Sequence, residues 1–414
     1  MEHVAPIVFY IGLIIFISHF FTALFEKTRI PDVLLLIIIG ILAHFIFNIN
    51  AKIFGNYGSL LSSLALVLML FEGGSHLSFD IIRKTLKRCF SISIITFIVT
   101  WITTFLYIHY FLNYDIIPAL YTGTVLGSIS PAVIVPIIKM LNVSDRTKSM
   151  LVVESAITDV LSIILSLGII ETLNSNQITI LGFIGMDIIA RMVCSIILGI
   201  GAAILWSAIL EKVRKFPNTI FTSLAYIFIL YGICEKLHWN GPLCILIFGL
   251  ILANAKQIPI GFLRGFGTSK LAEFTQLEKT LFSEVIFIVK TFFFIYLGLS
   301  IEFVGIKFFI SGLFLTILIY MFRIFITRYI LTDDFTPRSA KLISFIIPKG
   351  LAAAVLAEYP IHLDAIKNSP NLVVFEDLRA IVYSVVLFSI ILTAILIILE
   401  KSQKTKLTPL LYHF

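Results

Sequence analysis

The sequence predicts an all-α polytopic membrane protein with about 13 transmembrane helices. The first observation is composition: of 414 residues, 59% are hydrophobic and only 13% are charged, with a mean hydropathy of +1.05. A soluble protein cannot bury so large an apolar surface. The second observation is that the apolar residues fall into separate runs, many of them close to the ~20 residues that a helix needs to cross a bilayer.

Thirteen apolar runs are expected to form the membrane spans. The second and the ninth are short for a complete crossing. The first has no basic segment before it and no small-residue cleavage site after it, so it predicts a retained span rather than a signal peptide. In chain order, the runs cover residues 4–25, 33–48, 57–73, 90–111, 117–138, 149–171, 180–211, 217–235, 241–255, 280–301, 308–327, 342–358 and 380–400.

The distribution of Lys and Arg predicts the orientation of these spans. The connections after the odd-numbered spans, together with the short tail 401–414, hold 22 of the 31 basic residues, and the connections after the even-numbered spans hold five. Basic residues are retained on the cytoplasmic side of a cell membrane. We therefore expect the N-terminus outside and the C-terminus in the cytoplasm of a plasma-membrane protein.

The net charge of +7 is explained by this topology, so no nucleic-acid partner is expected. The four cysteines are scattered and predict neither a disulfide framework nor a metal site. The longest stretch outside the spans, residues 256–278, is too short for a regulatory nucleotide-binding domain. The expected partner is the lipid bilayer, and residues 1–400 are expected to form a single transmembrane domain.

Two acidic residues, Glu154 and Asp159, fall inside the sixth span. A carboxylate near the membrane centre costs at least ~2.5–3.5 kcal/mol, and such residues mainly serve ion or proton transport. The fifth span carries Gly127 and Pro131, and a proline within a helix removes a backbone donor and kinks the chain. A broken helix beside a buried acid is typical of the ion site of a transporter.

Three cations lie at comparable depth in other spans: Lys290, Arg323 and Lys349. At a rise of 1.5 Å per residue, they lie ~6–15 Å inside, and Asp159 lies ~15 Å inside. Two carboxylates and three cations can compensate one another there. Glu154 is expected to pair with Arg323 or Lys349 and hold the helices together, and each of the three cations could be purely structural.

Lys349 follows Pro348 and precedes Gly350, which predicts that the twelfth span is also broken.

The expected ion and proton site consists of Asp159, Ser155, Thr158 and Ser130. Ser155 and Asp159 are four residues apart and share a helix face. Their oxygens are hard ligands that suit a small alkali cation, such as Na⁺, or a proton, which makes Asp159 and Ser155 the candidate cation ligands. The loosened backbone around Ser130 would add free carbonyl groups.

Four motifs together resemble the cation:proton antiporter superfamily, near the NhaP-type sodium/proton exchangers. They occur in the family's order, and the likeness covers nearly the whole chain. The motifs are LMLFEGG (68–74), GSISPAVIVP (127–136), ESAITD (154–159) and PKGLAAAVLA (348–357).

The resemblance implies an inverted-repeat fold in which spans four to six (90–171) mirror spans eleven to thirteen (308–400) and form the ion-translocating core. Spans five and twelve would be unwound and cross near the ion site. Span seven (180–211) would be a linker, and spans one to three and eight to ten would form the dimerisation side of a homodimer.

Residue by residue, the resemblance implies that Asp159 binds the ion. It also implies that Arg323 pairs with Glu154 and that Lys349 occupies a second basic position.

The chain departs from the family pattern at two positions. Ser130 stands where many members have an aspartate, and Thr158 stands where members have Asn or Asp before the ion-binding aspartate. Members with Asp-Asp tend to be electrogenic and those with Asn-Asp electroneutral. The uncharged Thr158 therefore implies electroneutral exchange, and the lost acid at position 130 leaves K⁺ as an alternative to Na⁺.

The sequence thus predicts an antiporter that exchanges a monovalent cation (Na⁺, with Li⁺ or K⁺ as alternatives) for protons by alternating access at Asp159. Such a protein would serve pH homeostasis. No enzymatic activity and no cofactor are expected.

Three alternatives are weighed against the antiporter. An organic-anion symporter of the same fold type would bring a like charge to Asp159. An intramembrane aspartyl protease needs two facing aspartates. Only Asp159 and Asp187 lie deep, and Asp187 is expected to pair with Arg191 four residues on. A cation channel usually has symmetric filter segments, and no filter-like stretch occurs.

Overall fold

The computed structural model describes most of the chain, and the described residues are helical with no strand among them. Their all-α character agrees with the predicted fold class. The described residues are 9, 11–21, 32–47, 56–75, 79–141, 143–174, 183–216, 221–237, 239–257, 272, 274–301, 306–331, 335–363, 366 and 371–402.

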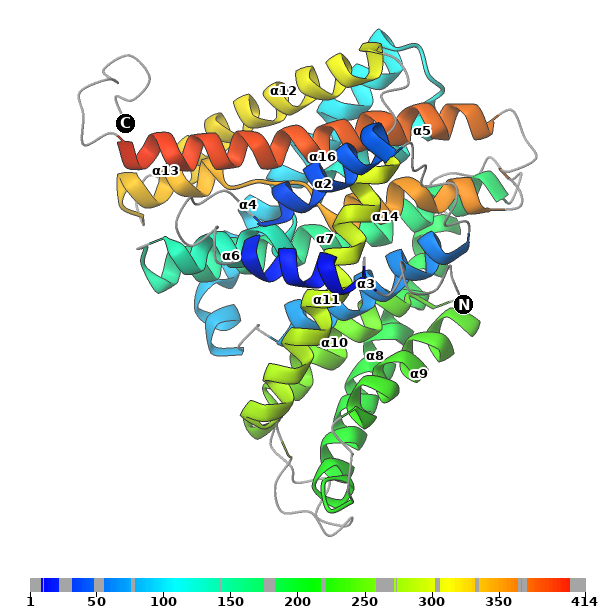
Figure 1. Cartoon of the computed structure of the whole chain (residues 1–414), viewed down its shortest axis with the longest axis vertical. Coiled ribbons are helices and arrows are strands. Elements are labelled where there is room, and N and C mark those ends of the chain that lie inside the picture. Colours follow the sequence, from blue (N-terminus) through cyan, green and yellow to red (C-terminus); the bar gives the residue numbers. More distant parts are fainter. Residues whose placement is uncertain are drawn as a thin grey trace. The chain divides into compact units, whose positions relative to one another are not determined.

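The helices follow the predicted runs closely (Figure 1). Several helices extend beyond their run, because charged residues near a helix end lower the local hydropathy without ending the helix. Their bounds are α2 (Asp32–Phe47), α3 (Asn56–Ser75), α4 (Phe79–Leu106) with the π-helix η2 (Tyr107–Phe111), α5 (Ile116–Gly127), α6 (Pro131–Met140), α7 (Asp145–Asn174), α8 (Phe183–Val213), α9 (Thr222–Lys236), α10 (Gly241–Ala253), η3 (Ala255–Gln257), α11 (Gln276–Ser300), α12 (Ile306–Ile330), α13 (Pro337–Phe345), α14 (Leu351–Glu358), η5 (Tyr359–His362) and α16 (Asn371–Ser402).

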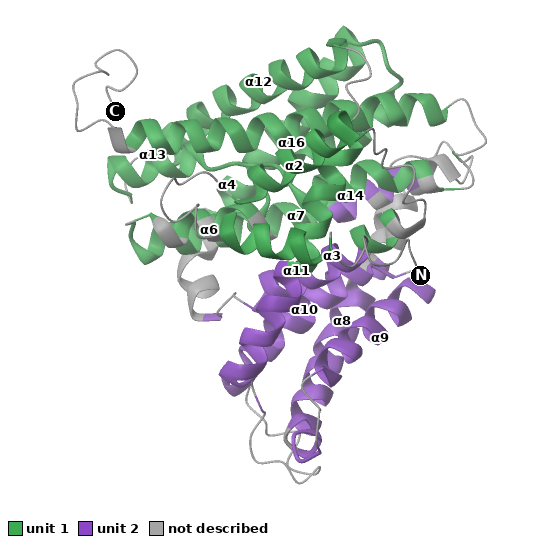
Figure 2. Cartoon of the chain, in the orientation of Figure 1, with its two compact units in different colours: residues 1–62, 87–162, 288–414 green, residues 63–86, 163–287 purple. Residues whose placement is uncertain are grey.

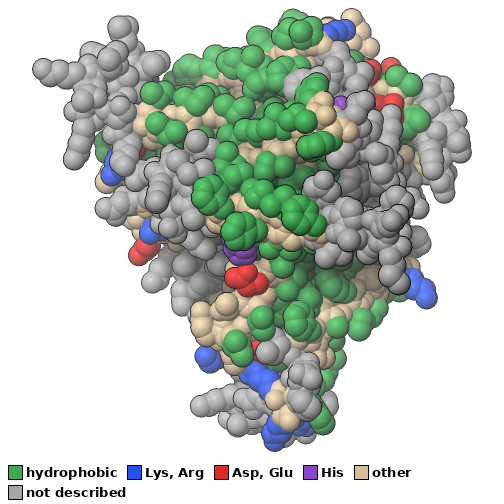
Figure 3. Space-filling view, viewed as in Figure 1, with side chains coloured by type: hydrophobic (Ala, Val, Ile, Leu, Met, Phe, Trp, Pro, Cys, Tyr) green, Lys and Arg blue, Asp and Glu red, His purple; other side chains and the backbone are tan. Residues whose placement is uncertain are grey.

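Six of the described helices are long and apolar enough to cross a membrane. Among the described residues on the face in Figure 3, hydrophobic side chains predominate and charged ones are few. Shorter apolar helices, such as Asp32–Phe47 and Gly241–Ala253, accompany the long ones. This pattern supports a multi-pass membrane protein, and the total of 13 spans stays a prediction. The six long segments are Cys89–Phe111, Asp145–Ile170, Val193–Leu210, Gln276–Ser300, Ile306–Ile330 and Asn371–Glu400.

The chain divides into two compact units, coloured separately in Figure 2. Unit 1 comprises residues 1–62, 87–162 and 288–414, and unit 2 comprises residues 63–86 and 163–287. Within unit 1, α12 packs along α16, and α14 packs against both α5 and α16. Within unit 2, α8 packs against α10. Every residue predicted for the ion site belongs to unit 1.

Both predicted breaks are confirmed. The fifth span consists of α5 and α6, separated by extended backbone at Ser128 and Ser130. Pro131 is the first residue of α6, where its missing N–H costs nothing and its fixed φ favours helix initiation. The twelfth span consists of α13 and α14, separated by residues 346–350.

Backbone N–H groups in the two breaks find hydrogen-bond partners in neighbouring segments. Ser130 donates its N–H to the carbonyl oxygen of Pro348 at 2.8 Å. The N–H of Lys349 donates to the Ser389 hydroxyl of α16 at 2.9 Å. Backbone groups inside a membrane need partners within the protein, and these contacts supply them. The breaks are therefore fixed structural features of unit 1.

Gly350 is required where the breaks meet. A Cβ atom at this position would overlap the side chain of Ser130, with both its Oγ and its Cβ too close. Any larger residue at position 350 would therefore push the two breaks apart. The need for glycine after Lys349 comes from this close approach and not from its φ. The φ of Gly350 is −166°, which is extended and which other residues also adopt.

Candidate functional site

Four buried side-chain atoms in unit 1 lack hydrogen-bond partners among the described residues: Oγ1 of Thr104, Nε of Arg323, Oγ of Ser130 and Oδ1 of Asp159. The last two belong to the first break and to the helix that carries the predicted ion-binding acid. Asp159 is 4% exposed and Ser130 is 2% exposed. Leaving a buried polar group unsatisfied typically costs ~1–3 kcal/mol, so such groups need an explanation. The groups on Asp159 and Ser130 are a carboxylate and a hydroxyl, which are the hard oxygen donors that alkali cations prefer.

Thr158 connects the first break to the helix that carries Asp159. Its hydroxyl accepts a hydrogen bond from the N–H of Ile129 at 3.2 Å and donates to the carbonyl of Glu154 at 3.0 Å. The extended segment around Ser130 is thereby attached to α7 next to Asp159. Thr158 is expected among the ion ligands. In the structure its hydroxyl connects the first break with α7.

Ser155 lies one helical turn before Asp159 and is completely buried. Its hydroxyl donates to the carbonyl of Val152 at 2.9 Å. A hydroxyl that donates in this way keeps lone pairs on its oxygen for a cation or another donor. Ser155 can therefore act as the second ligand that the sequence predicts.

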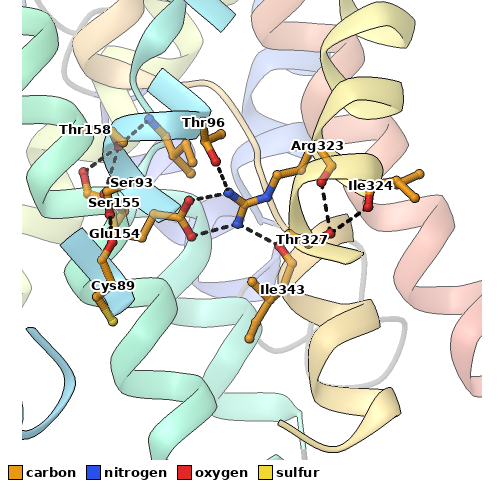
Figure 4. A network of polar contacts seen from close by, with 11 residues as sticks. Cys89, Ser93, Thr96, Glu154, Ser155, Thr158, Arg323, Ile324, Thr327 and Ile343 are labelled. Carbon is orange, nitrogen blue, oxygen red and sulfur yellow. Dashed lines mark hydrogen bonds and ion pairs between the residues drawn. The ribbon is translucent and has the colours of Figure 1, made fainter. Parts of the chain in front are cut away.

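Glu154 and Arg323 form a buried two-pronged ion pair, with each residue 1% exposed (Figure 4). Nη2 of Arg323 contacts Oε2 of Glu154 at 2.7 Å, and Nη1 contacts Oε1. The same guanidinium donates to the Thr96 hydroxyl at 2.6 Å and to the carbonyl of Ile343 at 3.0 Å. Of the two partners that the depth match predicts for Glu154, the structure selects Arg323.

This pair joins four elements, because its groups come from α4, α7, α12 and α13. Bidentate geometry with additional hydrogen bonds is the condition under which a buried charge pair is tolerated. Thr96 and Ile343 were not identified from the sequence. In the sequence, Thr96 stands at helical spacing from two further hydroxyl residues, Ser93 and Thr100. In the structure all three are buried.

Lys349 is 1% exposed and lies in the second break. Lys349 lies within electrostatic range of Arg323, Glu154 and Asp159. The structure therefore brings Asp159, Glu154, Arg323 and Lys349 into one electrostatic cluster. A cation of this kind offsets part of the negative charge that a bound proton or metal ion would otherwise neutralise.

Lys290 has a different partner. Its Nζ lies 3.2 Å from Oδ2 of Asp32, and both side chains are largely buried. Depth in the membrane predicts Lys290 among the charges around Asp159, but the fold pairs it with Asp32, which stands one residue before the predicted second span. In the sequence, the feature that indicates this pairing is an acid, Asp32, directly before the apolar run 33–48.

Glu358 is a buried acid that the sequence does not single out. It is 7% exposed and is the last residue of α14. It lies at the last residue of a predicted span, where an acid is easily taken for an interfacial one.

For the protease alternative, the side chain of Asp187 lies outside the described residues.

Comparison with known proteins gives consistent relatives at low identity. A probable Na⁺/H⁺ antiporter of Methanocaldococcus jannaschii is 23% identical over 243 residues, which cover 55% of this chain and 56% of the relative. The K⁺/H⁺ antiporter NhaP2 of Shewanella baltica is 25% identical over 253 residues, which cover 59% of this chain and 43% of the relative. The chain thus matches about half the length of these curated relatives, and both are transporters rather than enzymes.

The fold is shared with a solved structure over nearly its full length. The sodium proton antiporter MjNhaP1 of Methanocaldococcus jannaschii, solved at pH 8, superimposes with a TM-score of 0.75 at 18% identity, covering 97% of this chain and 99% of that one. The family described as "Sodium/hydrogen exchanger, transmembrane" matches residues 12–398. The chain therefore belongs to the family of transmembrane sodium/hydrogen exchangers.

Proposed function

We propose that this protein is a secondary antiporter that exchanges a monovalent cation for protons at Asp159. The observation that carries the proposal is the pair of buried oxygens without partners, Oδ1 of Asp159 and Oγ of Ser130, beside the first break. The carboxylate carries one negative charge, which either a proton or a monovalent cation can neutralise. Because both cannot bind at once, the two ions compete, and competition couples their movements.

Each neighbouring residue has a part in this proposal. Ser155 and Ser130 provide neutral oxygens for the cation, and Thr158 holds the break against α7. Lys349 offsets part of the charge of Asp159. Glu154 and Arg323 fix the helices around the site without binding the transported ion.

Na⁺ is the favoured cation, with K⁺ and Li⁺ as alternatives. A site with one carboxylate and neutral oxygens has a weaker field than a site with two carboxylates, and field strength is one of the factors proposed to discriminate K⁺ from Na⁺. The single carboxylate is therefore the reason to keep K⁺ as an alternative. The names of the relatives include both Na⁺ and K⁺ antiporters.

The function is tested by reconstituting the protein in liposomes that contain a pH-sensitive dye and adding Na⁺, K⁺ or Li⁺ separately. We expect proton flux in response to Na⁺, which an ionophore that collapses the pH gradient removes. Empty liposomes provide the control for leakage. The proposal is wrong if none of the three cations drives proton flux.

Exchange is expected to be electroneutral, with one proton for each cation. Asp159 is the carboxylate proposed to face each side in turn, and Thr158 and Ser130 are uncharged. Lys290 is held by Asp32, which makes it a poor second proton carrier. The measurement is the Na⁺-driven proton flux with the membrane potential clamped by valinomycin and potassium.

A flux that changes steeply with the imposed potential would contradict electroneutral exchange. In that case Lys349 is the candidate second carrier, because it lies in the second break with Asp159 as an electrostatic neighbour. Lys349→Gln would then be expected to remove the dependence on potential.

The remaining features of the proposal concern the membrane and the assembly. The Lys and Arg distribution supports a plasma-membrane protein with the N-terminus outside and the C-terminus in the cytoplasm. The division into an ion-translocating core and a dimerisation side, and the homodimer itself, are part of the same proposal. Exchange of this kind would serve pH homeostasis.

A further inference from the structure

We propose that Glu358 is a positioning residue, which anchors α14 to α16 through Arg379 and Tyr383 and thereby sets the cation affinity of the site at Asp159. The proposal rests on the antiport function given above and adds a residue outside the cluster of charges around Asp159. All the groups involved lie in unit 1.

The anchor consists of one acid on α14 and two residues on α16. The Tyr383 hydroxyl donates a short hydrogen bond to Oε1 of Glu358. Nη1 of Arg379 lies 3.6 Å from the same oxygen. Arg379 and Tyr383 are four residues apart and so present one face of α16 to the acid.

Packing alone does not account for Glu358. It is the last residue of α14, where the helix dipole disfavours a negative charge. Burying a charge is costly even when it is paired, and an apolar residue of similar size is often as stable or more stable. A buried acid at this end of a helix therefore indicates a need for one fixed position of α14 relative to α16.

Contacts along the whole length of the twelfth span fix it in unit 1. Arg323 contacts the carbonyl of Ile343 at the end of α13. Ser389 of α16 accepts from the N–H of Lys349 in the break at 2.9 Å. Glu358 holds the far end of α14, which is one short helix of 8 residues.

A short helix transmits a shift at one end to the other. The N-cap of α14 is Gly350, the residue that lies directly against Ser130 and leaves no room for even a Cβ atom. Tyr121 of α5 also donates to the carbonyl of Leu356 within α14, so the two half-helices move together. Loss of the anchor at Glu358 would therefore disturb Ser130, one of the oxygens proposed to bind the cation.

The experiment measures how proton flux in proteoliposomes depends on cation concentration, for Glu358→Gln and for Glu358→Gln combined with Arg379→Gln. The double variant removes both charges of the pair. In both we expect the apparent KM for the cation to rise on the order of tenfold, as is usual when a residue supporting a metal ligand is lost. The maximal rate should stay within about twofold, because cation binding and not the exchange step is weakened.

Arg338→Gln is the matched control. Arg338 of α13 also pairs with a residue of α16, Glu400, at 2.8 Å, but its side chain is 55% exposed and lies away from the break. It should leave the apparent KM unchanged. If the charge variants do not fold, Tyr383→Phe decides the question, because it removes a single hydroxyl and should still raise the apparent KM.

The outcomes separate the two proposals. Wild-type protein without cation-driven flux overturns the antiport function and this proposal with it. Wild-type flux together with an unchanged apparent KM in the folded variants overturns only the positioning role, even if their melting temperatures fall, because a merely structural contact would affect stability alone.

Discussion

Asp159→Asn is expected to abolish cation-driven proton flux while the protein still folds and assembles. An amide has nearly the same shape as the carboxylate but neither takes up a proton nor balances the charge of a cation. Because Asp159 is buried and its Oδ1 has no partner among the described residues, the substitution breaks no hydrogen bond of that atom. Flux is measured with the dye-loaded liposomes, and folding by size-exclusion chromatography and thermal unfolding in detergent.

Asp145→Asn provides the control on the same helix. The side chain of Asp145 is fully exposed at the start of α7, where it lies 3.7 Å from Nζ of Lys148. We expect this variant to exchange ions at the wild-type rate. Flux that persists in Asp159→Asn liposomes would rule out Asp159 as the shared site for cation and proton.

Glu154→Gln is expected to cause the largest loss of stability among single changes near the site. The substitution leaves the Arg323 guanidinium buried without its counter-charge, although Thr96 and the Ile343 carbonyl still accept from it. Removing one partner of a buried pair typically costs ~3–5 kcal/mol of the free energy of unfolding. The melting temperature in detergent should therefore fall more for Glu154→Gln than for Asp159→Asn.

A second variant distinguishes the charge pair from a general packing defect. Combining Glu154→Gln with Arg323→Gln removes both charges, and we expect it to recover part of the lost stability because no unpaired buried charge remains. Equal melting temperatures for wild type and Glu154→Gln would contradict the assignment of Glu154 as a structural partner of Arg323.

The sequence predicts the architecture well because hydropathy and backbone chemistry act locally. Apolar runs determine which segments are helical, and Pro131 and Pro348–Gly350 mark the breaks without any tertiary information. The acids of the sixth span stand out for the same reason, since each charge in an apolar run is costly wherever it points. The depth of Glu154 below the membrane surface, at about 1.5 Å per residue, also leaves two expected partners, Arg323 and Lys349.

Partner choice among charges at similar depth depends on helix rotation and packing, which sequence spacing does not contain. Lys290 illustrates this, because depth alone groups it with Asp159 and the fold instead places it 3.2 Å from Asp32. Glu358 illustrates the same limit at the end of a span, where only the fold brings Arg379 and Tyr383 to it.

By itself the sequence determined the membrane-spanning class and the two breaks, because each follows from local composition and spacing. It also predicts Asp159 as the ion-binding acid. Only the tertiary structure decided that Glu154 pairs with Arg323, that Thr158 bridges to the first break, and that Ser130 packs directly on Gly350. These contacts join residues far apart in the chain, and their geometry is set by how the helices pack against one another.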